Sequence, residues 1–141
     1  IIQKDISIVF PVHPRTMKMI KKFRMLSFLK SFKNLIITEP LGYLDFARLM
    51  ASSNLIMTDS GGIQEETTIL NIPCLTLRES TERPITVSRG TNAIVGNSTK
   101  KILLEVDKIL DSNYRAKSNR TPKFWDGKAS SRIAKVLLNF N

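Results

Sequence analysis

Ser60, Gly61 and Gly62 form the part of the chain best suited to bind an anion. They follow the short apolar run 55–58 and precede 63–70, which is rich in helix formers. A strand-to-helix turn of this composition offers free backbone N–H groups, a hydroxyl group and the positive end of a helix dipole, and glycines omit the Cβ atoms that would obstruct a ligand. The same residue types also suit an ordinary turn, so their spacing alone leaves both interpretations open.

Short apolar runs alternate with helix-length segments along the chain, which predicts the elements around this turn. Fully apolar strands are typical of a parallel sheet covered by helices on both faces, so the predicted fold class is α/β, a doubly wound, Rossmann-like parallel sheet. In such folds, ligands bind at the carboxyl ends of the strands. The predicted strands are 6–12, 35–38, 55–58, 74–77 and 93–95; the predicted helices are 16–33, 45–53, 63–70, 98–110 and a last helix capped by Asp126, and 78–89 is a predicted polar loop.

The charge of the chain favours anionic partners. Its 141 residues include 22 basic and 12 acidic side chains, for a net charge of +10. Nucleic acid, an acidic membrane surface and phosphorylated metabolites all fit this charge. An aromatic-rich platform for single strands and zinc-finger spacing are both missing, which disfavours nucleic acid.

Cys74 and the hydropathy of the chain indicate the cellular environment. The single cysteine lies in the apolar run 72–77, so we expect a buried, inert thiol in a reducing cytoplasm. No window reaches the roughly 18 to 20 apolar residues that a membrane span needs, so no membrane partner is expected. Neither a metal site nor a cofactor is expected.

Five motifs occur in a specific order along the chain. They are Asp59-Ser60-Gly61-Gly62-Ile63-Gln64-Glu65-Glu66, Arg78, Thr81-Glu82-Arg83-Pro84, Gly90-Thr91-Asn92 and Val95-Gly96. In order and spacing they resemble the carboxyl-terminal domain of the non-hydrolysing UDP-N-acetylglucosamine 2-epimerases. The resemblance runs from Ile6 to Arg132 and implies the carboxyl-terminal half of a two-domain fold of the GT-B type.

The resemblance also implies roles for the residues of the turn and the helix after it. Ser60 and the amides of Gly61 and Gly62 would hold the diphosphate of the nucleotide, and Glu66 would take the ribose hydroxyls. Phe46 and its neighbours would border the uracil. From the residues alone, Phe46 equally suits a core aromatic on a short helix.

Four further residues receive binding roles from the resemblance. Thr81, Glu82 and Arg83 would line the sugar and diphosphate side of the cleft, although a salt-bridged surface loop is the competing interpretation. His13 would lie at the interdomain cleft without taking part in proton transfer, and a hydrogen-bonded turn residue is its plain alternative. Arg15 and Ile85 depart from the residues common in the family, which leaves the activator contact and the substrate preference open.

The family reaction eliminates UDP from C1 as a proton leaves C2, and then adds UDP back. It needs an acid and a base beside the sugar and a group that stabilises the departing diphosphate. The resemblance places the catalytic carboxylates and a His-Arg motif in an amino-terminal domain that precedes this chain, so the catalytic residues are unknown here. We therefore expect residues 1–141 to be the UDP-binding portion of a cytoplasmic homodimeric isomerase, inactive alone, with UDP-N-acetylglucosamine or UDP as its ligand.

Several alternatives stay open at this point. The parent enzyme could act on a related UDP-diacetamido-uronic acid. The Asp59-Ser60-Gly61 turn disfavours a hydrolysing epimerase. The acidic segment Gln64-Glu65-Glu66 disfavours a glycosyltransferase. From another class, a stand-alone nucleotide-binding or nucleic-acid-binding module would use the net positive charge, and its affinity for an oligonucleotide would collapse with salt.

Overall fold

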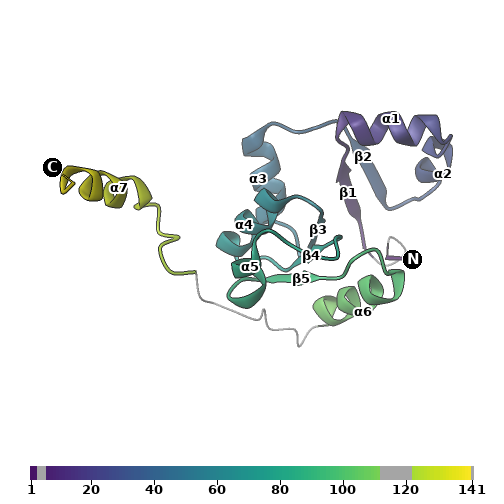
Figure 1. Cartoon of the computed structure of the whole chain (residues 1–141). Helices are drawn as coiled ribbons and strands as arrows, with labels where there is room; N and C mark the ends of the chain where they lie inside the picture. The colour runs from purple at the N-terminus through teal and green to yellow at the C-terminus, as the bar shows by residue number, and fades with distance from the viewer. Residues whose placement is uncertain (3–5, 112–121, 141) are drawn as a thin grey trace. The chain divides into compact units, whose positions relative to one another are not determined.

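The computed structural model describes residues 1–2, 6–111 and 122–140. The chain divides into two compact units, Ile1–Leu49 and Met50–Asn141. Each unit combines parallel strands with helices, as the labels in Figure 1 show. Every strand pair is parallel, which confirms the predicted α/β class.

The first unit is built on two paired strands. Its elements are β1 (Ile8–Pro11), α1 (Pro14–Lys22), α2 (Leu26–Lys30), β2 (Leu35–Thr38) and α3 (Tyr43–Ala51), the last of which ends just beyond the unit boundary. Ile8 lies opposite Leu35, and Pro11 lies opposite Thr38. Val12 and Ile20 are buried in this unit.

The single helix predicted over 16–33 is wrong, because the chain turns at Arg24. This residue has a left-handed φ of 55°. Its N–H donates to the Lys21 carbonyl, and the Met25 N–H donates to the Ile20 carbonyl at 3.0 Å. These two bonds end α1 in a Schellman motif. Glycine usually occupies the left-handed position of that motif. Because arginine stands there instead, the sequence did not indicate that the helix ends at this point.

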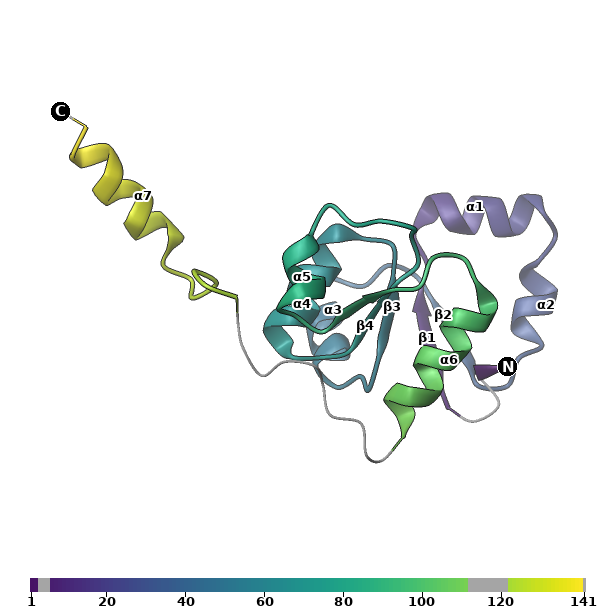
Figure 2. The ribbon, with the colours of Figure 1, turned by 60° about the horizontal axis from the view of Figure 1, so that its bottom comes forward.

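The second unit contains a three-stranded parallel sheet in the order β3-β4-β5. The central strand β4 is fully buried, and α4 contacts all three strands. Figure 2 shows α4 and α5 together on one side of the strands and α6 on the other. The elements are β3 (Ile56–Thr58), α4 (Gly61–Leu70), β4 (Cys74–Thr76), α5 (Pro84–Ser88), β5 (Asn92–Ile94), α6 (Thr99–Leu110) and α7 (Ala129–Leu138).

The interior of the second unit is unusually polar. Leu75, Val95 and Val106 form part of its apolar core, each at most 2% exposed. All the buried polar residues of the described chain also belong to this unit. Because buried polar groups must find partners, their hydrogen bonds decide how the surrounding loops are placed. These residues are Thr58, Gln64, Thr67, Thr68, Thr76, Thr86, Thr91 and Asn92.

Two further predictions need correction. The predicted polar loop 78–89 contains the short helix α5, which begins with Pro84 in its first turn, a position where the missing N–H costs nothing. Asp126 does not cap α7, because the N-cap residue is Lys128. Instead, the Asp126 carboxylate accepts a hydrogen bond from the Lys128 N–H and pairs with the Arg132 guanidinium. None of the described helices is both long and apolar enough to cross a bilayer.

The burial of Cys74 generates a test of the core. The residue is 0% exposed, as predicted. Burial raises the pKa of its thiol from 9.0 to about 11, against a smaller lowering by a hydrogen bond with Thr67. At pH 8 only about one thiol in a thousand is then ionised, so we expect a disulfide reagent to label the native chain very slowly and the chain in denaturant within minutes. Rapid labelling without denaturant would contradict this packing.

Candidate functional site

The amino end of α4 lies directly after the carboxyl end of β3. Only Asp59 and Ser60 separate the strand from the helix. The N–H of Ser60 donates to the Thr58 hydroxyl at 3.1 Å, which fixes the turn. Ser60 is the N-cap residue, with φ −84° and ψ 128°, yet its side chain makes no capping hydrogen bond. Its exposed hydroxyl therefore remains available to a ligand. The residue follows the end of a strand, as the sequence predicted.

Gly61 and Gly62 occupy the first two helical positions. A Cβ atom at Gly61 would come no closer than 3.8 Å to Arg83, and one at Gly62 no closer than 3.9 Å to the Ser60 hydroxyl. These are ordinary van der Waals distances, and neither glycine has a positive φ. The fold itself therefore does not require glycine at either position, whereas close approach of a ligand to the helix end would.

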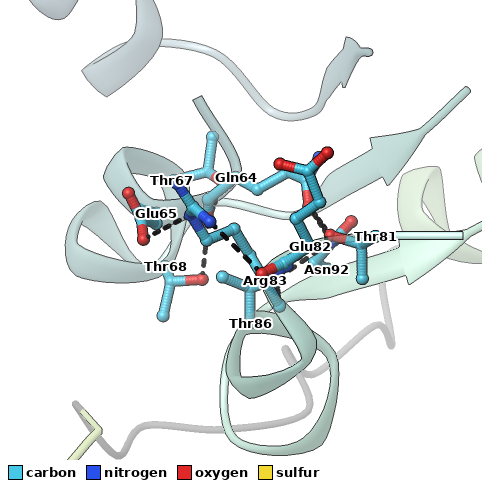
Figure 3. Close-up of polar contacts among 9 residues, drawn as sticks. All are labelled: Gln64, Glu65, Thr67, Thr68, Thr81, Glu82, Arg83, Thr86 and Asn92. Atoms are coloured by element: carbon cyan, nitrogen blue, oxygen red, sulfur yellow. Dashed lines mark hydrogen bonds and ion pairs between the residues drawn. The ribbon is translucent and has the colours of Figure 1, made fainter. Parts of the chain in front are cut away.

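Arg83 brings a positive charge to the same helix end. Its Nε atom lies 2.8 Å from the Glu65 carboxylate, an ion pair between two partly exposed side chains. Its aliphatic stem lies closest to the Cβ position of Gly61. Figure 3 shows Arg83 directed toward Glu65 of α4. A guanidinium group in this place can form paired hydrogen bonds with phosphate oxygens.

Behind this helix end, a buried hydrogen-bond network joins α4 to β4 and β5 (Figure 3). The Gln64 Oε1 atom accepts from the Asn92 Nδ2 atom at 3.1 Å. The Asn92 Oδ1 atom in turn accepts from the Thr76 hydroxyl at 2.7 Å. Asn92 also donates to the Thr86 hydroxyl at 3.0 Å, so α5 is included.

Residues of the same network form hydrogen bonds with both the N–H and the carbonyl group of the Arg83 backbone. The N–H of Arg83 donates to the Thr81 hydroxyl at 2.9 Å, and the Thr86 hydroxyl donates to the Arg83 carbonyl at 2.7 Å. Thr81 completes the connection by donating to Gln64 Oε1 at 2.6 Å. The loop between β4 and α5 is therefore fixed to α4 through the partly buried bond between Thr81 and Gln64.

The predicted site residues of the second unit gather around α4. Ser60, Gly61 and Gly62 start the helix, and Glu66 follows Gly62 by four residues, about one turn further along. Thr81, Glu82 and Arg83 form the segment just before α5, and Glu82 is exposed. The predicted site residues did not include Gln64, Asn92, Thr76 or Thr86. Gln64 and Asn92 lie within the family motifs, whereas Thr76 and Thr86 were visible only as polar residues inside or beside apolar runs.

Two predicted site residues belong to the first unit and are described by themselves. Phe46 lies on α3 and is partly buried. His13 is the N-cap of α1, and its Nδ1 atom accepts a hydrogen bond from the Arg15 N–H at 3.2 Å. This local bond gives His13 a structural reason to be where it is, and its binding role stays a prediction.

Comparison with known proteins identifies the family. The family model for UDP-N-acetylglucosamine 2-epimerase matches residues 1–138. The chain belongs to the UDP-N-acetylglucosamine 2-epimerase family. It is 45% identical over 133 residues to the UDP-N-acetylglucosamine 2-epimerase of Methanocaldococcus jannaschii, covering 94% of this chain and 35% of that protein. It is 41% identical to the Escherichia coli K12 protein of the same name, covering 96% and 36%.

Solved structures of family members have the same fold. The Methanocaldococcus jannaschii epimerase in complex with UDP-GlcNAc and UDP superposes with a TM-score of 0.85 at 44% identity, covering 96% of this chain and 36% of that one. The Neisseria meningitidis epimerase bound to UDP-GlcNAc gives 0.74 at 37% identity, covering 94% and 36%. The chain thus spans about a third of the length of these epimerases.

The open space at Gly62 generates a stability test. We expect Gly62→Ala to raise the free energy of unfolding by roughly 0.3–1 kcal/mol, because alanine is the better helix former and meets no close neighbour. Gly90→Ala is the matched control, since its Cβ would lie 2.4 Å from the Thr68 hydroxyl. That variant should lose about 1–3 kcal/mol. Urea denaturation measures both; a clear loss for Gly62→Ala would mean that the fold itself needs this glycine.

Proposed function

We propose that this chain is the UDP-binding part of an enzyme that interconverts UDP-N-acetylglucosamine and UDP-N-acetylmannosamine. The observation that carries the proposal is the amino end of α4, with an uncommitted Ser60 hydroxyl, two glycines that the fold does not require, and Arg83 beside them. Membership of the family supports it, as do relatives that were crystallised with UDP or UDP-GlcNAc.

The diphosphate fits the chemistry of this helix end. Free backbone N–H groups and the helix dipole favour an anion there, and Gly61 and Gly62 let its oxygen atoms approach the backbone. Ser60 adds one hydroxyl donor, and Arg83 adds charged donors. When the C1–O bond breaks, negative charge grows on the departing UDP, so the same donors would stabilise the leaving group as well as bind the substrate.

The remaining predicted residues complete the nucleotide site in this proposal. The Glu66 carboxylate, about one turn beyond Gly62, would accept hydrogen bonds from both ribose hydroxyls. Thr81 and Glu82 would face the sugar. Phe46 would border the uracil and His13 the cleft toward the rest of the enzyme, although both belong to the first unit.

We further propose that the acid and base acting at C2 lie in the part of the enzyme outside this chain. The chain itself spans only about a third of the length of its relatives. The chain would then bind UDP without epimerising the substrate. The whole enzyme would be a cytoplasmic homodimer that contains an amino-terminal domain, and it would use neither a metal nor a cofactor.

Separate roles for Ser60 and Glu66 can be tested with UDP and uridine. Ser60→Ala removes one hydroxyl donor to a charged phosphate, so the loss of UDP binding should be roughly 1–3 kcal/mol, with uridine almost unaffected. Glu66→Gln should weaken both ligands to the same extent, because both contain the ribose. Chemical-shift titration of the chain measures weak binding of each ligand. Equal losses for both ligands in both variants would mean that the substitutions merely loosen the turn.

A further inference from the structure

Gln64 is a buried polar residue close to the candidate site. The residue lies on α4, one helical turn after the N-cap Ser60, and is only 1% exposed. A long polar side chain removed from water must find hydrogen-bond partners inside the protein. Its Oε1 atom accepts from Thr81 at 2.6 Å and from Asn92 at 3.1 Å.

Gln64 and the next residue, Glu65, hold Arg83 from two sides. On the inner side, Gln64 binds the Thr81 hydroxyl, which accepts the Arg83 N–H at 2.9 Å. On the outer side, the Glu65 carboxylate lies 2.8 Å from the Arg83 Nε atom. Two consecutive residues of α4 thus connect the backbone and the guanidinium group of Arg83 to the helix whose amino end starts at Gly61.

The inner connection is the stronger constraint. An ion pair between half-exposed side chains contributes only about 0–1 kcal/mol, too little to order an arginine side chain with roughly 2 kcal/mol of rotamer entropy. The Gln64 end of the inner bond is only 1% exposed, so water does not replace a partner that is lost there, at a cost of about 1–3 kcal/mol. Gln64 therefore fixes the backbone position from which the Arg83 side chain extends, and the Glu65 ion pair adds a weak preference for its direction.

We propose that Gln64 is a positioning residue for diphosphate binding: by holding Thr81, it keeps the Arg83 guanidinium beside the amino end of α4. The proposal rests on the proposed function, because it takes that helix end as the diphosphate site. Gln64 itself would not touch the ligand, because the residue is only 1% exposed. A guanidinium group that is already in place loses less freedom when the ligand arrives, so affinity for the charged part of the ligand increases.

A first experiment needs no ligand. Gln64→Met keeps the length of the side chain and removes the acceptor, whereas Thr81→Val removes the partner on the loop. Both variants should lower the NMR order parameter of the Arg83 Nε–Hε bond relative to the wild-type chain, toward the values below about 0.6 that are typical of flexible groups. Thr91→Val is the matched control, because it removes a buried hydroxyl bond to the Thr67 carbonyl and leaves the Arg83 contacts intact. Unchanged order in Thr81→Val would overturn the proposal even if Gln64→Met failed to fold.

A second experiment measures UDP and uridine affinity by chemical-shift titration. Gln64→Met should weaken UDP about tenfold, the effect of losing one charged hydrogen bond, and leave uridine within a factor of about two. In an Arg83→Met background the same change should have no further effect on UDP, since Gln64 acts only through Arg83. A loss that persists in that background, or that affects uridine equally, would show a general role in the core and overturn the proposal.

Different results would contradict the proposed function and the positioning role of Gln64. If the wild-type chain binds UDP no better than uridine, the proposed function fails, and the diphosphate role of Gln64 fails with it. If UDP is preferred but Gln64→Met and Thr81→Val leave both the order of Arg83 and the preference unchanged, only the positioning role is overturned.

Discussion

The second unit depends on the need of buried amides for hydrogen-bond partners. Gln64 and Asn92 are almost completely removed from water, and an unpaired amide in such a place costs about 1–3 kcal/mol. Asn92 finds its partners in Gln64, Thr76 of β4 and Thr86 of α5, and the Gln64 Oε1 atom accepts from Asn92 and Thr81. The network thereby holds β4, β5, α4 and α5 in one arrangement. An apolar core of the same volume would tolerate small slips that this network forbids.

The site combines this fixed arrangement with an open helix end. The turn from β3 into α4 is short, and the side chain of the N-cap residue Ser60 makes no capping hydrogen bond with the helix. The glycines that follow leave space that the fold could have filled. Arg83 reaches the same place from a loop that the buried network holds. Backbone donors and a charged side chain thus converge from two segments, an arrangement that suits an anion such as a diphosphate.

Local signals predicted the parts of the fold that depend on local sequence. The run 55–58 and the glycines after it indicated a strand end and a helix start, and both are present. The break at Arg24 was missed because the left-handed residue is not glycine. The network was missed for a different reason: Gln64 bonds to residues 17 and 28 positions away, and no local pattern records such pairs. The family motifs contained Gln64 and Asn92 without indicating their contact.

Binding of the diphosphate at the amino end of α4 is tested most directly by comparing the amide spectra of the chain with saturating UDP and with saturating uridine. The difference between the two spectra isolates the diphosphate. We predict that it concentrates on the backbone amides of Gly61, Gly62 and Ile63 and on the Nε–Hε group of Arg83. Differences spread over the lysines of α1, with the start of α4 unchanged, would show that the diphosphate only meets the general positive charge of the chain and would contradict this account.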